Sequence, residues 1–192
     1  MPLLPALAFA RQLIEGRLKN GGRALDGTAG NGRDTLFLAQ LVGGNGKVWA
    51  FDIQAQALSN TAGLLRENGV EERVELIAAS HADLADYVRE PLDAAMFNFG
   101  YLPDGDKTVT TKADSSVRAM QAAAALLAEG GLLTAVVYSG HPAGRAEAAA
   151  IEQWAAALPQ EQYQVLHYRF TNQRNYPPQL LAIEKRIRKP NR

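Results

Sequence analysis

The hydrophobic and polar positions of this chain alternate between a helical period and short apolar runs. Between Leu3 and Leu18, apolar residues recur every three or four positions, which predicts an amphipathic helix. Apolar runs of strand length then alternate with helical runs, a pattern typical of parallel βαβ units. The expected strands are 23–26, 47–52, 73–78, 92–99 and 132–139, and the expected helices between them are 34–42, 54–68, 82–88 and 113–128, the last ended by Gly130 and Gly131.

The C-terminal part departs from this alternation. One more helix is expected at 146–158, but the runs 163–170 and 179–186 follow each other with no helical pattern between them. These two runs are therefore expected to pair antiparallel at one edge of the sheet. The fold class predicted is α/β, with a doubly wound, Rossmann-like sheet that is mostly parallel and has an antiparallel strand at its C-terminal edge.

Length and composition predict one globular domain, because the chain has 192 residues, of which 47% are hydrophobic and 21% are charged. The absence of cysteine excludes a disulfide framework, a thiolate zinc site and a cysteine nucleophile. No apolar stretch reaches the roughly 18 to 20 residues needed to span a bilayer, and the start lacks the basic region of a signal peptide. A cytoplasmic protein is therefore expected.

Charge is balanced overall but unevenly distributed. Residues 166–192 contain seven basic residues and one acidic residue, a local net charge of +6. This asymmetry predicts a polyanionic partner at the C-terminal end, or else a basic tail that is only solvated. The three histidines, at 81, 141 and 167, lack the spacing of metal ligands, so no metal is expected.

A glycine-rich loop follows the first expected strand and precedes a helix, which is the context in which such a loop indicates ligand binding. The segment 26–32 reads Asp-Gly-Thr-Ala-Gly-Asn-Gly, and it lacks both the Gly-Lys-Ser/Thr of a P-loop and the spacing of a dinucleotide fingerprint. The carboxylate of Asp26 would repel a pyrophosphate and attract a ligand that carries an ammonium and a sulfonium group. Asp52 ends the second strand, where an acid can accept hydrogen bonds from ribose hydroxyls.

Together, these features resemble the cofactor site of class I S-adenosylmethionine methyltransferases. Gln54 would line the adenosine site or be a surface residue that opens a helix, and His81 would contact the cofactor or cap a short helix. The expected cofactor-binding residues are Asp26, Thr28, Gly30, Asn31, Gly32, Asp34, Asp52, Gln54, His81 and Asn98.

The fourth strand ends in Asn-Phe-Gly-Tyr at 98–101, at the sheet edge where open α/β sheets bind ligands. Amino-methyltransferases often have Asn/Asp-Pro-Pro-aromatic at this place, where the Asn side chain and a backbone carbonyl orient the target amine. Phe99 and Gly100 replace the two prolines here, whereas Asn98 and Tyr101 fit the pattern.

Five segments extend the resemblance to nearly the whole chain, and on them the chain is similar to the bacterial MnmM/YtqB methyltransferases, once labelled rRNA methylase-like. These segments are 26–35, 51–54, 98–107, 138–142 and 172–178. The resemblance implies methyl transfer from S-adenosylmethionine to the exocyclic amine of 5-aminomethyl-2-thiouridine at the wobble position, in the anticodon region of tRNA.

The resemblance also implies roles for individual residues and segments. Residues 1–20 would form an N-terminal helix, 23–140 the cofactor-binding core, and 141–192 a helix and strand pair on the substrate side. The expected catalytic residues are Asn98, Tyr101 and His141. The expected substrate-binding residues are Tyr101, Lys107, His141, Asn172, Arg174 and Asn175. A homodimer that presents two basic edges to the RNA is a further expectation.

Three alternative functions stay open at this point. The first is methylation of rRNA or of another tRNA position, which would use the same cofactor site. The second is methylation of a small molecule, which predicts no tRNA binding and no effect of the basic end on activity. The third is a noncatalytic adenosine-binding module, which would tolerate loss of Asn98.

Overall fold

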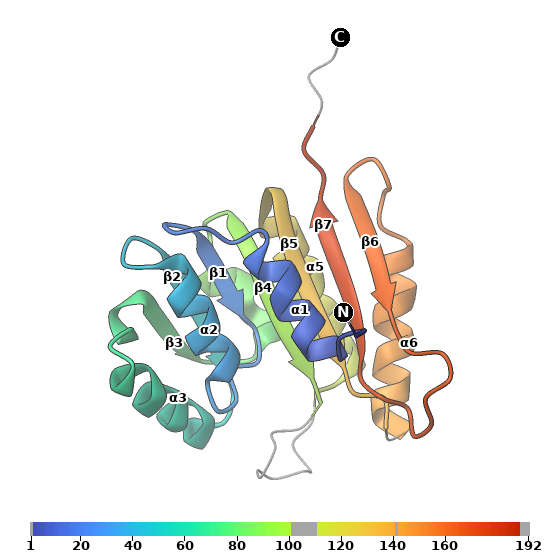
Figure 1. Cartoon of the computed structure of the whole chain (residues 1–192), viewed down its shortest axis with the longest axis horizontal. Helices are drawn as coiled ribbons and strands as arrows, with labels where there is room; N and C mark the ends of the chain where they lie inside the picture. Colours follow the sequence, from blue (N-terminus) through green and yellow to red (C-terminus); the bar gives the residue numbers. More distant parts are fainter. Residues whose placement is uncertain (1, 101–110, 141, 189–192) are drawn as a thin grey trace.

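The computed structural model describes residues 2–100, 111–140 and 142–188, which form a seven-stranded sheet between two layers of helices (Figure 1). The strands are β1 (Arg23–Asp26), β2 (Lys47–Asp52), β3 (Val74–Ala78), β4 (Leu92–Phe99), β5 (Leu127–Val137), β6 (Tyr163–Tyr168) and β7 (Gln179–Lys185). The α-helices are α1 (Ala6–Glu15), α2 (Arg33–Val42), α3 (Ala55–Glu67), α4 (Leu84–Tyr87), α5 (Ala113–Leu126) and α6 (Pro142–Ala156). Two 3₁₀ turns, η1 (Glu71–Arg73) and η2 (His81–Asp83), precede β3 and α4.

The strand order is β3-β2-β1-β4-β5-β7-β6. Strands β1 to β5 are parallel, and β7 pairs antiparallel with both β5 and β6, which confirms the predicted α/β class and the antiparallel pairing at the C-terminal edge. Strand β7 lies between β5 and β6, with β6 at the edge of the sheet. This order fits the burial of the two strands, because Leu180–Ile183 of β7 are buried, whereas Gln164–Leu166 of β6 are exposed. A continuous apolar run needs neighbours on both sides, and a strand with an exposed centre suits the edge of the sheet.

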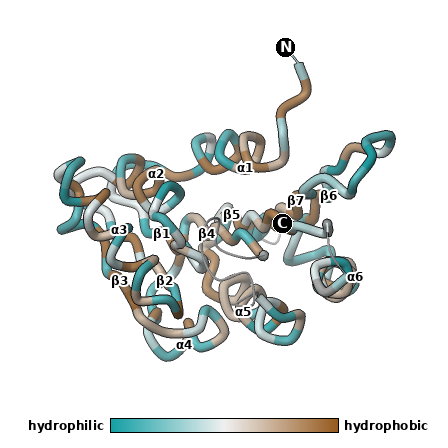
Figure 2. Tube along the Cα trace, turned by 90° about the horizontal axis from the view of Figure 1, so that it is seen from below, coloured by the Kyte–Doolittle hydropathy of each residue, from teal (hydrophilic) through white to brown (hydrophobic). Residues whose placement is uncertain are grey.

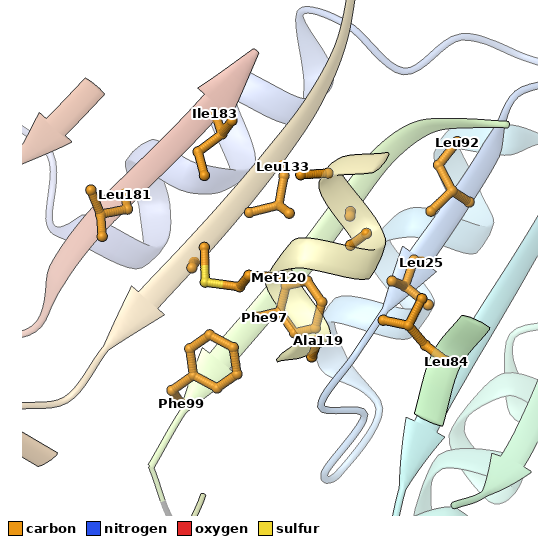
Figure 3. Packing of buried hydrophobic residues seen from close by; sticks show 14 of the residues in the cluster. Leu25, Leu84, Leu92, Phe97, Phe99, Ala119, Met120, Leu133, Leu181 and Ile183 are labelled. Atoms are coloured by element: carbon orange, nitrogen blue, oxygen red, sulfur yellow. The ribbon is translucent and has the colours of Figure 1, made fainter. Parts of the chain in front are cut away.

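The two faces of the sheet are covered by different helices. Figure 2 shows α1 and α2 on one side of the strands and α4, α5 and α6 on the other. The larger apolar cluster contains Phe97 and Phe99 of β4 together with Met120 of α5, and Figure 3 shows these side chains from close by. Ile14 of α1 and Leu65 of α3 belong to the cluster on the opposite face.

The start of β5 differs from the sequence-based expectation. We expected a helix to 128, capped by Gly130 and Gly131, with a strand from 132. Instead α5 ends at Leu126, β5 begins at Leu127, and both glycines lie within the strand. The pairing register with β4 shifts here, and Gly130 has a φ of 77°. Glycine tolerates this conformation, so an irregularity that resembles a β-bulge replaces the expected helix cap.

Other boundaries shift by a few residues. The first helix begins at Ala6 because Pro5 precedes it, and α6 begins at Pro142 rather than at 146, since proline is well suited to the first helical position. The helix expected at 82–88 divides into η2 and α4. Within the three described segments, no helix is long and apolar enough to cross a membrane.

Candidate active site

The carboxyl ends of β1, β2, β4 and β5 meet at the lower edge of the sheet in Figure 1. Asp26 ends β1, Asp52 ends β2, and Asn98 is the penultimate residue of β4. Because β1 pairs with both β2 and β4, these three polar side chains come from neighbouring strands. In open parallel sheets this edge is where ligands bind.

The loop between β1 and α2 approaches its neighbours so closely that two of its positions need glycine. A Cβ on Gly27 would lie 2.0 Å from the ring of Phe97, which is buried in the core. Gly32 has a φ of 81°, and a Cβ there would lie 2.9 Å from the Cα of Thr61. The Thr61 hydroxyl donates a hydrogen bond to the Gly30 carbonyl at 2.9 Å. The loop is therefore fixed against β4 and α3, and the absence of side chains lets its backbone come close to a ligand.

We expect Gly27→Ala to destabilise the protein by about 2–3 kcal/mol, because the added methyl group overlaps the Phe97 ring and the core repacks poorly. Urea unfolding measures this change. Gly63→Ala is the matched control: Gly63 lies inside α3 with no atom within 4 Å of an added Cβ, so alanine should stabilise that helix by about 0.5–1 kcal/mol. Equal stability of Gly27→Ala and the wild type would contradict the close approach described above.

Asp52 holds the glycine loop from the side of β2. Its two carboxylate oxygens accept hydrogen bonds from the backbone N–H groups of Gly30 and Gln54, each at 2.9 Å. A carboxylate oxygen can accept more than one hydrogen bond, so both retain capacity for hydroxyl donors of a ligand. Gln54 precedes α3 and makes no side-chain cap, while Asn31 accepts a hydrogen bond from Asn60 of α3 at 3.0 Å.

Asp26 is fully buried beneath the same loop. One of its oxygens accepts a hydrogen bond from the Thr35 hydroxyl at 2.6 Å, and the other accepts one from the Thr28 N–H at 3.1 Å. Burial, reinforced by the negative charge of Asp34, raises the pKa of Asp26 to about 7. Near neutral pH this carboxyl group is therefore partly protonated, and a nearby cation would favour its charged form.

Asn98 is held by a chain of contacts that crosses three elements. Its Nδ2 donates to Oδ2 of Asp34 in α2 at 2.6 Å, and Oδ1 of Asp34 accepts the guanidinium of Arg11 in α1 at 2.6 and 2.8 Å. The Asn98 N–H also donates to the Thr28 hydroxyl at 2.7 Å. Because an ionised carboxylate only accepts hydrogen bonds, the amide nitrogen must face Asp34, which turns Oδ1 away from it. That oxygen is buried and has no hydrogen-bond partner among the described residues.

Tyr138, directly after β5, lies beside the end of β4. Its N–H donates to the carbonyl of Phe99 at 3.2 Å, and its ring lies about 3.5 Å from where a Cβ of Gly100 would be. Burial, together with the charge of Asp34, raises the pKa of the Tyr138 phenol, which therefore stays neutral at ordinary pH. Sequence reasoning assigned no role to Tyr138 or Arg11. Tyr138 lies in one of the quoted segments, but nothing near Arg11 in the sequence predicts its partner.

His81 begins η2, after β3. Its ring packs edge-on against the rings of Phe97 and Phe99, with centroid distances of 6.5 and 5.7 Å. Burial lowers the pKa of His81, so the ring is neutral, and its Nε2 has no hydrogen-bond partner within residues 2–100, 111–140 and 142–188. The capping role considered for His81 belongs to Ser80 instead, since the hydroxyl of Ser80 accepts from the N–H of Ala82 at 3.2 Å.

These observations fit S-adenosylmethionine. The edge combines a glycine loop, an acid suited to ribose hydroxyls, and a buried acid whose ionisation a cation would favour. It also contains two buried polar atoms, His81 Nε2 and Asn98 Oδ1, for which the described part of the chain offers no hydrogen-bond partner. Buried polar atoms in folded proteins are nearly always paired, so unpaired ones at the ligand-binding edge are consistent with an incomplete site.

The loop between β6 and β7 reaches the same edge of the sheet, because β6 is parallel to β5. Three of the expected substrate-binding residues lie in this loop and are exposed: Asn172, Arg174 and Asn175. The other three expected substrate-binding residues, of which Tyr101 and His141 are also expected to be catalytic, lie outside the described residues: Tyr101, Lys107 and His141.

Among the described residues, the basic side chains of the C-terminal segment lie at two different edges of the sheet. Because β7 runs antiparallel, its basic end lies at the opposite edge from Arg169 and Arg174. Lys185 donates to the carbonyl of Leu127 at 2.6 Å, and the guanidinium of Arg188 lies 3.9 Å from a carboxylate oxygen of Glu129. At least two of the basic side chains in this segment, Lys185 and Arg188, therefore contact groups of the protein itself.

Comparison with known proteins adds a family assignment. Residues 48–184 match the family described as "Putative rRNA methylase". The chain is 35% identical over 191 residues to a chloroplastic tRNA (mnm(5)s(2)U34)-methyltransferase of Arabidopsis thaliana, with 94% of this chain and 69% of that protein covered.

Two solved structures agree with this assignment. A putative rRNA methylase from Clostridium thermocellum superposes with a TM-score of 0.95 at 38% identity, covering 96% of this chain and all of that one. A putative methyltransferase from Streptococcus mutans, solved in complex with SAH, superposes with a TM-score of 0.88 at 34% identity, covering 96% of this chain and 99% of that one. SAH is S-adenosylmethionine without its transferable methyl group, so the Streptococcus mutans protein was solved with the demethylated form of that cofactor.

Proposed function

This chain belongs to the rRNA methylase family of S-adenosylmethionine-dependent methyltransferases, and we propose that it methylates the aminomethyl nitrogen of 5-aminomethyl-2-thiouridine at the wobble position of tRNA. The observation that supports an amine acceptor is the unpartnered, buried Oδ1 of Asn98 at the cofactor edge. The name of the Arabidopsis relative supports the choice of nucleoside.

The cofactor would lie across the ends of β1, β2 and β4, within residues 23–140. Asp52 would accept the ribose hydroxyls, Asp26 would stabilise the positive charge of the ligand, and His81 would lie at the adenine. The remaining proposed contacts come from the glycine loop and its surroundings: Thr28, Gly30, Asn31, Gly32, Asp34, Gln54 and Asn98. When bound, S-adenosylmethionine supplies an electrophilic methyl group on a sulfonium sulfur.

The protein would act on the amine mainly by positioning it. An aliphatic amine is a strong nucleophile once neutral, so it needs loss of a proton and alignment with the methyl group. Asn98 Oδ1, fixed by the contact of its amide nitrogen with Asp34, would accept a hydrogen bond from the amine and orient its lone pair. The phenol of Tyr138 keeps its own proton at ordinary pH, so it is unsuited to accept one from the amine. We therefore propose that His141 accepts the proton that the amine loses.

The substrate side would be formed by residues 141–192 together with the segment after β4. A wobble nucleotide lies in a single-stranded loop, so its base can enter a pocket without duplex opening. We propose that Tyr101 covers this base and that Lys107, Asn172, Arg174 and Asn175 contact the RNA of the anticodon region. A homodimer and a cytoplasmic location stay predictions.

The raised pKa of Asp26 predicts how cofactor affinity depends on pH. A ligand cation favours the carboxylate, so binding must expel the proton that Asp26 carries below its pKa of about 7. Affinity should therefore rise by up to about tenfold per pH unit below 7 and level off above it. Isothermal titration with S-adenosylmethionine measures this, and Asp26→Asn should flatten the profile.

The stability of the free protein should depend on pH in the opposite sense. The pKa of Asp26 is higher in the folded state, about 7, than its ordinary value of 3.8, so the folded state binds the proton more tightly. The contribution of Asp26 to stability is therefore lost as pH rises from about 4 to 7. Urea unfolding at several pH values measures this loss of stability. A cofactor-affinity profile that is identical in the wild type and Asp26→Asn would contradict the raised pKa of Asp26 on which both expectations depend.

Transfer of a labelled methyl group tests the substrate. We expect label to enter tRNA that carries 5-aminomethyl-2-thiouridine, and not the same tRNA with unmodified uridine at the wobble position. Ribosomal RNA is the necessary comparison, because the family description names rRNA. Label in rRNA and none in either tRNA would replace the proposed substrate while leaving the cofactor site intact.

A further inference from the structure

A groove of about 730 Å³ lies between α6 and the loop that joins β6 to β7. We call it the arginine groove, and the lining residues used below are Arg145, Glu152, Arg169, Phe170, Arg174 and Tyr176. It starts at Ser139 and Gln179, next to the end of β5. Asn98 pairs with Val136 in the sheet, and Val137 pairs with Gln179, so the groove begins about two strand spacings, roughly 10 Å, from Asn98.

The charge of the groove favours an anion. The side chains of Arg145, Arg169 and Arg174 are exposed, and none of them forms an ion pair with another residue in the described part of the chain. Glu152 also lines the groove, with its carboxylate 3.3 Å from Nδ1 of His167, so three arginines face one acidic side chain there. Unpaired guanidinium groups bind phosphate oxygens through two parallel N–H donors.

The groove also holds aromatic side chains in positions suited to stacking. Tyr176 is 62% exposed, and both it and Asn175 adopt left-handed backbone conformations, with φ values of 49° and 67°. Asparagine adopts such a conformation readily, but for Tyr176 it is unfavourable, and an exposed ring returns little packing energy. The guanidinium of Arg145 lies over the Tyr176 ring, 5.2 Å from its centroid, and Phe170 forms part of the wall. Backbone strain that presents an aromatic ring to solvent at a cationic groove points to ligand binding.

We propose that the arginine groove binds a nucleotide next to the reacting one in a single-stranded RNA loop, with its phosphate at Arg169 and Arg174 and its base on Tyr176. The proposal rests on the proposed function only in that the substrate is RNA, whichever nucleoside is methylated. Every base has a flat face that can stack, so the groove positions the RNA and does not read its sequence.

Binding of a fluorescently labelled anticodon stem-loop, measured by anisotropy with S-adenosylhomocysteine present, tests the groove without requiring methyl transfer. Tyr176→Ala should weaken binding about tenfold, whereas Tyr176→Phe, which keeps the ring, should bind like the wild type. The double variant Arg169→Ala/Arg174→Ala should weaken binding and lower the slope of log affinity against log salt by about 0.7 per arginine. Arg186→Ala removes the same charge from an exposed position at the opposite edge of the sheet and should bind like the wild type.

Loss of RNA binding in the groove variants but not in Arg186→Ala supports the proposal, provided that their melting temperatures and cofactor affinities are unchanged. If the groove variants bind RNA like the wild type, the proposed role of the groove is wrong, whereas the proposed substrate is unaffected. The same conclusion follows if Arg186→Ala loses as much RNA affinity as the groove variants. A wild-type protein that binds no RNA would overturn the groove and the proposed substrate together. Transfer of methyl groups to rRNA but not to tRNA would change the nucleoside and leave the groove in place.

Discussion

Replacing Asn98 by alanine is expected to lower kcat for methyl transfer by about a hundredfold, while the affinity for S-adenosylmethionine changes by less than about tenfold. The side chain supplies the buried Oδ1 that would orient the amine, and its own orientation is fixed by Asp34 at 2.6 Å. Without that acceptor, the amine loses alignment with the methyl group. Single-turnover rates at saturating cofactor, together with the Kd of the cofactor, separate the two effects.

The contacts behind Asn98 give a graded test of the same idea. Arg11 touches Asp34 but not Asn98, so Arg11→Ala should lower kcat by a smaller factor, about tenfold or less, by loosening Asp34. The exposed Arg66 at the end of α3 is the matched control and should leave kcat unchanged when replaced by alanine. If Asn98→Ala keeps full kcat, or loses cofactor binding to the same extent as kcat, the positioning role is wrong.

Asp52→Ala should weaken S-adenosylmethionine binding by at least about a hundredfold. The carboxylate would accept both ribose hydroxyls, and hydrogen bonds to a charged group contribute about 1.5–3 kcal/mol each. It also fixes the glycine loop through the N–H of Gly30, so its removal loosens the backbone that surrounds the ligand. Two such losses together account for the predicted factor.

Calorimetric titration measures this affinity directly. Asp52→Asn should fall between the wild type and Asp52→Ala, because an amide keeps one of the two acceptor oxygens. Glu67→Ala removes an exposed carboxylate at the end of α3 and controls for the change in net charge. Wild-type affinity in Asp52→Ala would show that the cofactor does not lie at the end of β2.

The parts of the fold that the sequence predicts are those set by local pattern. The bounds of β1, β2 and β4 agree with expectation, because each is a short apolar run between turn or charged residues. Asp26 and Asp52 could be placed at strand ends for the same reason. The insertion of β7 between β5 and β6 was not predicted, since it depends on which strand's centre is buried by contacts distant in sequence.

The site shows the same division between local and long-range information. The glycine loop and Asn98 are readable from neighbouring residues, whereas the contact of Arg11 with Asp34 joins residues 23 positions apart on two helices. The left-handed backbone at Tyr176 and the separation of the basic segment into two edges depend on how the last two strands pair. These features follow from tertiary packing, which has no signature in a short window of sequence.

Mass spectrometry of nucleosides tests the central claim most directly. Purified protein is incubated with S-adenosylmethionine and tRNA that carries 5-aminomethyl-2-thiouridine, and the tRNA is then digested to nucleosides. The account predicts that this nucleoside gains one methyl group on its aminomethyl nitrogen, and that Asn98→Ala abolishes most of the gain. An unchanged nucleoside, with S-adenosylmethionine still bound by the protein, would contradict the proposed substrate.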